Sequence, residues 1–251
     1  MKKMLSLGLL LFMLLSAFSL QAQVKKKVVK KPVTNAVKKK ATPKPSAKLK
    51  DTIASKASEV RVRIATDLGE IIVKLSNKTP LHRDNFVKLV NDHFYDSLLF
   101  HRVISRFMIQ GGDPESKNAP PDIMLGKGDV GYMIPAEFDT TLYHKKGALA
   151  AARNNNPERA SSGCQFYLVQ GKTYTDEELN MIEQQSGVRF NSAKRMTYKM
   201  LGGTPQLDMN YTVFGEVESG QEVIDQIANA ARDNNNRPLT DVHMSMEIIK
   251  E

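Results

Sequence analysis

The sequence predicts a mainly β domain in which antiparallel strands close, or nearly close, into a barrel plugged by two helices. Short apolar or alternating runs of strand length recur between residues 60 and 249, and residues typical of turns separate them. Only two main segments carry apolar residues at helical spacing. Because closure removes the exposed edges of a sheet and leaves two open ends for helices to cover, a closed antiparallel barrel accounts for both observations.

The first half of this domain opens with a hairpin and a helix. Residues 60–64 alternate between apolar and charged side chains, residues 67–69 are typical of a turn, and residues 70–75 provide the returning strand. Thr79 and Pro80 predict the N-cap and the first turn of a helix that ends near Asn91. Further strands are predicted at residues 98–103, 107–110, 148–152 and 165–170.

The last part of the chain adds a strand, the second helix and a closing strand. Residues 213–217 are predicted as a strand and Ser219-Gly220 as a turn. A final strand at residues 243–249 can close the sheet. The apolar stripe of the second helix lies at Val223, Ile224, Ile227, Ala228 and Ala231.

Residues 1–22 have the pattern of a secretory signal peptide. Lys2 and Lys3 precede an apolar run from Leu5 to Leu15, and small residues near Ala22 offer a cleavage site. The apolar run is short for a bilayer span, so a membrane anchor is disfavoured. No cysteine lies near residue 23, which excludes the usual lipoprotein anchor. We therefore expect an exported protein, in the periplasm.

Residues 23–58 are predicted to form a disordered basic tail. Residues 24–50 contain eleven lysines and no acidic residue, with three prolines interspersed. The chain carries +9; the signal peptide contributes +2 and the tail +11, which leaves about −4 for residues 51–251. No specific nucleic acid is expected, because the tail lacks interleaved aromatics. Anionic envelope polymers or lipid headgroups are the expected partners, and a solubilising spacer is the alternative.

No cofactor or metal is expected. The five histidines are scattered, without a ligand pair at short metal-binding spacing. Cys164, the single cysteine, lies in an apolar run without a partner, and we interpret it as a small buried residue rather than a nucleophile.

The stretch from Phe100 to Gly112 combines an arginine, large apolar side chains and an amide at strand-like spacing. Strand alternation puts Met108 and Gln110 on one face and Phe107 and Ile109 on the other, so a cationic and amide lining beside an apolar floor is possible. An edge strand whose arginine reaches water would have the same pattern.

Three ordered motifs resolve that ambiguity by resemblance. Residues 100–104 with 107–113, residues 162–168, and Leu207-Asp208 followed by residues 211–217 are similar to segments of the cyclophilin family of peptidyl-prolyl isomerases. The resemblance runs from about residue 60 to 250. It implies an eight-stranded barrel with a helix at each end, hence a cyclophilin-like isomerase domain at residues 59–251 whose site lies on the outer wall.

The resemblance also implies roles for particular residues, with proline-containing segments of folding exported proteins as substrates. Arg102 and Gln110 are the expected catalytic residues. The expected substrate-binding residues are His101, Phe107, Met108, Ala152, Arg153, Gln165, Tyr167, Leu207 and Tyr211. Rotation before proline is slow because nitrogen lone-pair donation gives the bond double-bond character. A permanently charged donor such as Arg102, aimed at that nitrogen, would weaken the double bond.

This chain departs from the family pattern at several positions. Tyr167 replaces a phenylalanine, Arg153 an asparagine, Tyr211 a histidine in many members, and Gln206 a tryptophan in eukaryotic members. Residues 172–204 form an insertion for which one or two surface helices are expected, with a capping signal at residues 175–178. It is either a tolerated loop elaboration or a partner site.

Two other functions remain open. A periplasmic chaperone or scaffold could grip proline-containing segments without accelerating isomerisation, and it would tolerate the loss of Arg102 far better than an enzyme. Alternatively the lysine-rich tail is the main functional element. The protein is expected to be a monomer.

Overall fold

The computed structural model describes residues 59–121 and 123–249. The predicted signal peptide and lysine-rich tail lie outside these residues. Within them, no helix is long and apolar enough to cross a membrane.

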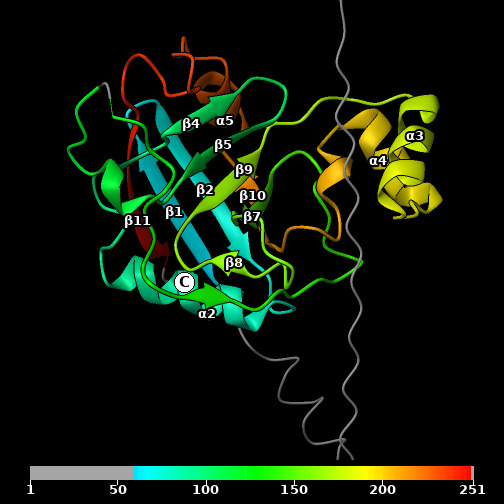
Figure 1. The fold of residues 1–251 in the computed structure, drawn as a ribbon, viewed down its shortest axis with the longest axis horizontal. Coiled ribbons are helices and arrows are strands. Elements are labelled where there is room, and N and C mark those ends of the chain that lie inside the picture. The colour runs from blue at the N-terminus through cyan, green and yellow to red at the C-terminus, as the bar shows by residue number, and fades with distance from the viewer. Residues whose placement is uncertain (1–58, 122, 250–251) are drawn as a thin grey trace, which may run out of the picture. The chain divides into compact units, whose positions relative to one another are not determined.

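One antiparallel sheet dominates the domain (Figure 1). Its strand order is β3-β11-β1-β2-β10-β7-β9-β5-β4, and the sheet is curled. A separate two-stranded sheet, β6 with β8, was not predicted, because two-residue strands give no periodic signal. The strands are β1 (Arg61–Thr66), β2 (Gly69–Leu75), β3 (Leu98–Leu99), β4 (Arg102–Ile104), β5 (Met108–Gly111), β6 (Met133–Ile134), β7 (Ala148–Ala151), β8 (Ser161–Ser162), β9 (Phe166–Val169), β10 (Val213–Ser219) and β11 (His243–Ile249).

The predicted mainly β antiparallel fold is confirmed, but the closed eight-stranded barrel is not, because the strands form a nine-stranded open sheet. The difference arises at the segment predicted as one strand, residues 98–103. Its first part, β3, pairs with β11, and its second part, β4, pairs with β5. Phe100 and His101 between them belong to neither ladder, although the Phe100 amide donates to the carbonyl of Val242. The two ends of the sheet are therefore consecutive in the chain.

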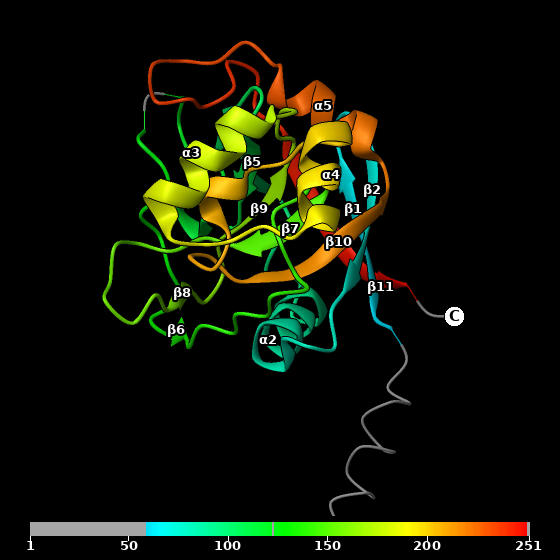
Figure 2. The same cartoon turned by 90° about the vertical axis from the view of Figure 1, so that its right-hand side faces the viewer.

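Two helices lie at opposite ends of the sheet, as Figures 1 and 2 show: α2 (Pro80–Asn91) and α5 (Gln221–Ala228). Both contribute apolar side chains to the main core, Phe86 and Leu89 from α2 and Ile224 and Ile227 from α5. The second predicted helical stripe thus forms a helix, which ends before Ala231.

The start of α2 is capped in an unexpected way. Thr79 is the N-cap residue, but its side chain makes no capping hydrogen bond. The carboxylate of Glu137, more than fifty residues away, instead accepts the amides of Leu81 (3.1 Å) and His82 (3.0 Å) and lies 2.7 Å from Nδ1 of His82. A tertiary contact thus replaces the local cap that the sequence predicted.

Two helices occupy the segment 172–204: α3 (Asp176–Ser186) and α4 (Ser192–Met200). The capping box predicted at Thr175 and Glu178 is present. The pair has its own small core, in which Leu179, Phe190 and Tyr198 are buried. In Figures 1 and 2 both helices lie together on the side of the sheet where β7, β9 and β10 run.

The substitution Glu137→Ala is expected to lower the free energy of unfolding by about 2–3 kcal/mol, because two helix N-terminal amides and the buried ring of His82 lose their acceptor. Urea denaturation at pH 7 measures this change. Glu158→Ala, at an exposed loop position, is the matched control. Equal unfolding midpoints for the two variants would contradict the tertiary cap.

Candidate active site

A row of side chains crosses the sheet from β4 to β10. In the observed register Arg102 is opposite Gln110, Gln110 is opposite Tyr167, Tyr167 is opposite Ala150, and Ala150 is opposite Val213. Directly opposed residues of antiparallel strands project from the same face of a sheet. The register therefore joins the two predicted catalytic residues and one predicted pocket residue on one face.

A second cluster of buried apolar side chains surrounds this row, separate from the main core. Residues of the same strands alternate between the two: Ile109, Leu149 and Leu168 belong to the main core, whereas Met108 and Ala150 belong to the second cluster. We call this second cluster the outer wall. It consists of Met108, Ala148, Ala150, Ala152, Tyr167, Val169 and Val213, with Ile104, Phe107, Leu142, Leu207 and Tyr211 packed against it.

Arg102 lies at one end of the outer wall, and neutral groups hold it. Its Nη1 donates to Oε1 of Gln110 at 3.1 Å and lies 4.0 Å from the sulfur of Met108. None of the described carboxylates forms an ion pair with Arg102. Partial burial lowers the pKa of Arg102, yet a guanidinium keeps its charge at neutral pH. An unneutralised cation therefore stands beside an apolar surface.

Gln110 is itself fixed by a chain of amide hydrogen bonds. Its Nε2 donates to Oε1 of Gln165 at 2.9 Å. Nε2 of Gln165 donates to the carbonyls of Gly128 (2.7 Å) and Gly126 (3.2 Å). These bonds set the amide orientation of Gln110, so that its oxygen faces Arg102. A cavity of about 750 Å³ lies beside this chain, with Ala152 and Arg153 also in its lining.

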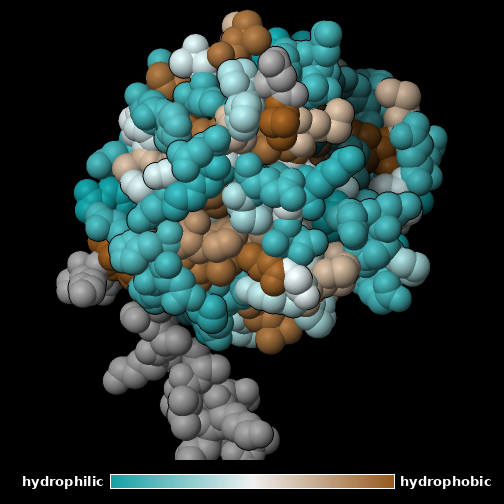
Figure 3. Space-filling view, turned by 60° about the vertical axis from the view of Figure 1, so that its left-hand side comes forward, coloured by the Kyte–Doolittle hydropathy of each residue, from teal (hydrophilic) through white to brown (hydrophobic). Residues whose placement is uncertain are grey.

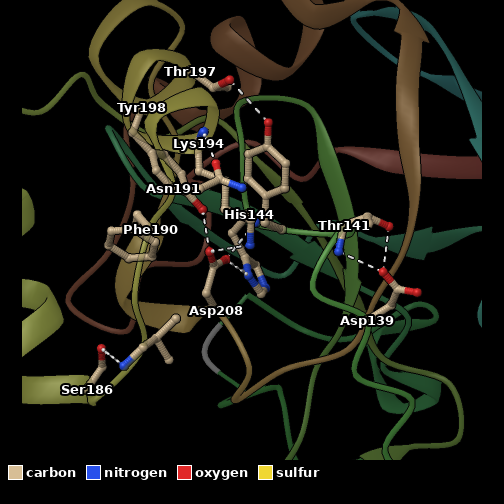
Figure 4. Close-up of polar contacts among 12 residues, drawn as sticks. Asp139, Thr141, His144, Ser186, Phe190, Asn191, Lys194, Thr197, Tyr198 and Asp208 are labelled. Carbon is tan, nitrogen blue, oxygen red and sulfur yellow. Dashed lines mark hydrogen bonds and ion pairs between the residues drawn. The ribbon is translucent and has the colours of Figure 1, made fainter.

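Two residues to which the sequence assigned no role, His144 and Asp208, hold the hydroxyl end of Tyr167. The Nδ1 of His144 donates to Asp208 at 3.0 Å, and the Tyr167 hydroxyl lies 3.0 Å from Nε2 of the same ring. The other oxygen of Asp208 accepts the Tyr198 hydroxyl at 2.8 Å (Figure 4). Burial is the main cause that raises the pKa of Tyr167. Asp208 belongs to the Leu207-Asp208 motif, but no signal in the sequence connects it with His144.

Arg153 and Tyr211 form another border of the wall. The Arg153 guanidinium lies 4.7 Å from the centre of the Tyr211 ring. It also donates from Nε to the carbonyl of Asn210 (2.9 Å) and from Nη2 to its side chain (2.6 Å). Tyr211 packs edge-on against Tyr167, and Leu207 lies nearby in the short helix η2 (Pro205–Leu207).

Two predicted positions differ from expectation. Strand alternation predicted that Phe107 and Met108 project from opposite faces of the sheet, but both belong to the outer wall or pack against it. Phe107 precedes β5 and follows Arg106, which has a φ of 63°, so the period of two does not yet apply. His101 is only 3% exposed and lies near Gly126 rather than on the wall. All the other predicted residues lie on the wall or in the amide chain beside it.

A second group of side chains has the serine–histidine–carboxylate arrangement of a hydrolytic triad. Oγ of Ser161 lies 2.9 Å from Nε2 of His82, whose Nδ1 lies 2.7 Å from Glu137. Ser161 is 1% exposed, and the adjoining cavity of about 10 Å³ admits no substrate. We interpret these three residues as a structural hydrogen-bond network, not as a catalytic triad. Cys164 is equally inert, because burial raises the pKa of its thiol to about 11.

Comparisons with known proteins agree with this architecture. The family model of the cyclophilin type peptidyl-prolyl cis-trans isomerases matches residues 61–248. A Staphylococcus aureus protein, provisionally named a peptidyl-prolyl cis-trans isomerase, is 35% identical over 185 residues, which are 73% of this chain and 88% of that protein. A Staphylococcus epidermidis protein of the same name is 33% identical over 186 residues, 74% of this chain and 89% of that protein.

Solved structures share the fold. The crystal structure of a Cryptosporidium parvum cyclophilin type peptidyl-prolyl cis-trans isomerase has a TM-score of 0.58 at 23% identity and covers 77% of this chain and 99% of its own. A second structure of that protein, in the presence of the dipeptide Ala-Pro, has a TM-score of 0.57. This chain belongs to the cyclophilin-type peptidyl-prolyl cis-trans isomerase family, and the predicted family and enzyme class are confirmed.

The burial of His101 predicts an acid-sensitive fold. Burial is the main cause that lowers its pKa to about 4; Asp113 opposes that shift and Arg102 adds to it. The unfolded chain, with an ordinary histidine pKa of about 6.5, takes up the proton first as the pH falls. The contribution of neutral His101 to the free energy of unfolding is therefore fully present above pH 6.5. About 3 kcal/mol of that free energy is lost as the pH falls from 6.5 to 4.

In the variant His101→Phe, which keeps an aromatic ring, this part of the pH dependence should disappear. Urea unfolding of both proteins between pH 7 and pH 4 measures it. A variant that lost stability as steeply as the wild type would contradict the neutral, buried state of His101.

Proposed function

We propose that this protein accelerates rotation about X-Pro bonds by donating a hydrogen bond from Arg102 to the prolyl nitrogen. The observation that carries the proposal is the position of Arg102, which is held by Gln110 at 3.1 Å, unpaired with any carboxylate of the described residues, and bordered by the apolar outer wall. The X-Pro bond resists rotation by about 18–20 kcal/mol. A donor aimed at its nitrogen localises the lone pair and lowers that barrier.

The outer wall supports the second requirement, a slot for the proline ring. Phe107, Met108, Tyr167 and Leu207 supply apolar surface next to Arg102. Ala152 and Arg153 line the adjoining cavity, where we assign them contact with the substrate chain, and Gln165 keeps Gln110 oriented. Because His101 is buried behind this surface, we assign it no contact with substrate. No nucleophile or proton transfer is needed.

Three finer points belong to this proposal. If β3 and β4 are counted as one strand interrupted at residues 100–101, the sheet order becomes that of an eight-stranded barrel. The signal-peptide pattern supports export to a periplasm, where the enzyme would assist the folding of other exported proteins as a monomer. The lysines of the tail support contact with anionic envelope components.

The substitution Arg102→Ala is expected to reduce kcat/KM for a proline tetrapeptide by roughly a hundredfold, about 2.7 kcal/mol of transition-state stabilisation. The cis-to-trans rate is measured at matched concentration with folding confirmed by circular dichroism. Arg63→Ala, which removes an arginine from surface ion pairs on β1, is the control and should keep the wild-type rate.

A wild type no faster than the uncatalysed reaction would contradict the enzyme. A chaperone that only grips proline segments would bind peptide equally well with and without Arg102, and titration of a fluorescent peptide separates the two functions.

A further inference from the structure

The helical pair α3–α4 is attached to the rest of the domain through Asp208 and Tyr143. Tyr198 of α4 donates to Asp208, and Nζ of Lys194 lies 3.9 Å from the same carboxylate. Nζ of Lys194 also lies 4.7 Å from the centre of the Tyr143 ring. Through His144, Asp208 is connected to Tyr167 of the proposed proline slot. The helices and the slot are therefore held in one arrangement.

A groove of about 360 Å³ lies between α3 and the segment 206–210. Ile182 and Val188 give it an apolar side, and Gln185 lies beside them. Asn210 lines the opposite side and Arg159 is also in its lining. The end of α3 is ordered by local bonds, since the Phe190 amide donates to Glu183 at 2.6 Å. The groove is thus a built feature of the insertion.

The groove and the proposed slot are bordered by the same segment of the chain, residues 206–211. Gln206 and Asn210 line the groove, and Leu207 and Tyr211, the residues that follow them, pack against the outer wall. Arg153 spans both, because it donates to Asn210 and stacks on Tyr211. The segment 206–211 therefore borders both the groove and the outer wall.

The charged side chains along the groove and the slot that are not buried are all arginines. Arg102, Arg153 and Arg159 each lack a carboxylate partner within the described residues. Arg159 instead donates to the carbonyl of Met209 at 3.0 Å. The carboxylate of Asp208 does not balance them, since it is 3% exposed and engaged by His144 and Tyr198. The domain as a whole is slightly acidic, so this local excess of cations is a property of the site. Figure 3 shows that apolar side chains elsewhere on one face are exposed only in patches between hydrophilic ones.

We propose that the groove is a second subsite, which binds the stretch of substrate next to the proline and favours aliphatic and acidic side chains there. This inference rests on the proposed isomerase function and specifies its substrate class. Aliphatic side chains fit Ile182 and Val188. Carboxylates complement Arg159 in the lining and Arg153, which is bonded to Asn210 at the edge of the groove.

The test compares substrates of different length and charge. A tetrapeptide with a central Ala-Pro reports the slot alone. Two twelve-residue peptides with the same centre carry leucine and aspartate, or leucine and lysine, on both sides. The wild type should have a kcat/KM about tenfold higher for the aspartate peptide than for the tetrapeptide, chiefly through KM, and no gain for the lysine peptide. Fluorescence anisotropy measures peptide binding independently of isomerisation.

Gln185→Trp should fill the groove and return the long-to-short ratio of kcat/KM to about one. Gln184→Trp changes the preceding residue of α3, which is also exposed but does not line the groove. This variant should keep the wild-type ratio. The subsite would be overturned if the wild-type protein had the same kcat/KM for all three peptides, or if the two variants had the same long-to-short ratio of kcat/KM. If no peptide were isomerised, the proposed function would fail, whereas unequal anisotropy binding of the aspartate and lysine peptides would still support the groove.

Discussion

A cation that must act on a neutral peptide bond has to be held without being neutralised, and the hydrogen bond between Arg102 and Gln110 meets that constraint. A carboxylate at position 110 would fix the guanidinium more strongly but would compete for its charge. An amide holds it at 3.1 Å and leaves the charge unbalanced. The further bonds through Gln165 to the carbonyls of Gly126 and Gly128 then serve to keep the amide oxygen turned toward Arg102.

The curled sheet makes such a site possible because both its faces are apolar. One face packs the main core beneath α2 and α5, and the other is the outer wall. Three alanines of one segment, Ala148, Ala150 and Ala152, belong to the wall, and all three are buried among its larger side chains. Tyr167 is the largest side chain of this row, and its hydroxyl is satisfied by His144 instead of facing the apolar slot.

The sequence predicted the opening hairpin, the helices and the choice of Arg102 and Gln110 as site residues, because these depend on local periodicity and on motifs that resemble a family. It failed where distant contacts or strand ends decide. Thr79 did not cap α2 because Glu137 does so from across the fold. Phe107 contacts the wall because it lies in a turn before its strand. The bond between His144 and Asp208 joins residues 64 positions apart, which one sequence cannot reveal.

A double-mutant cycle on kcat/KM with Gln110→Leu and Arg102→Ala measures whether Gln110 acts through Arg102. We predict that Gln110→Leu slows the wild type about tenfold and has almost no further effect when Arg102 is already alanine, since there is no longer a guanidinium to hold. Fully additive effects of the two substitutions would mean that Gln110 and Arg102 act independently on the substrate, and that Gln110 does not serve to hold the guanidinium.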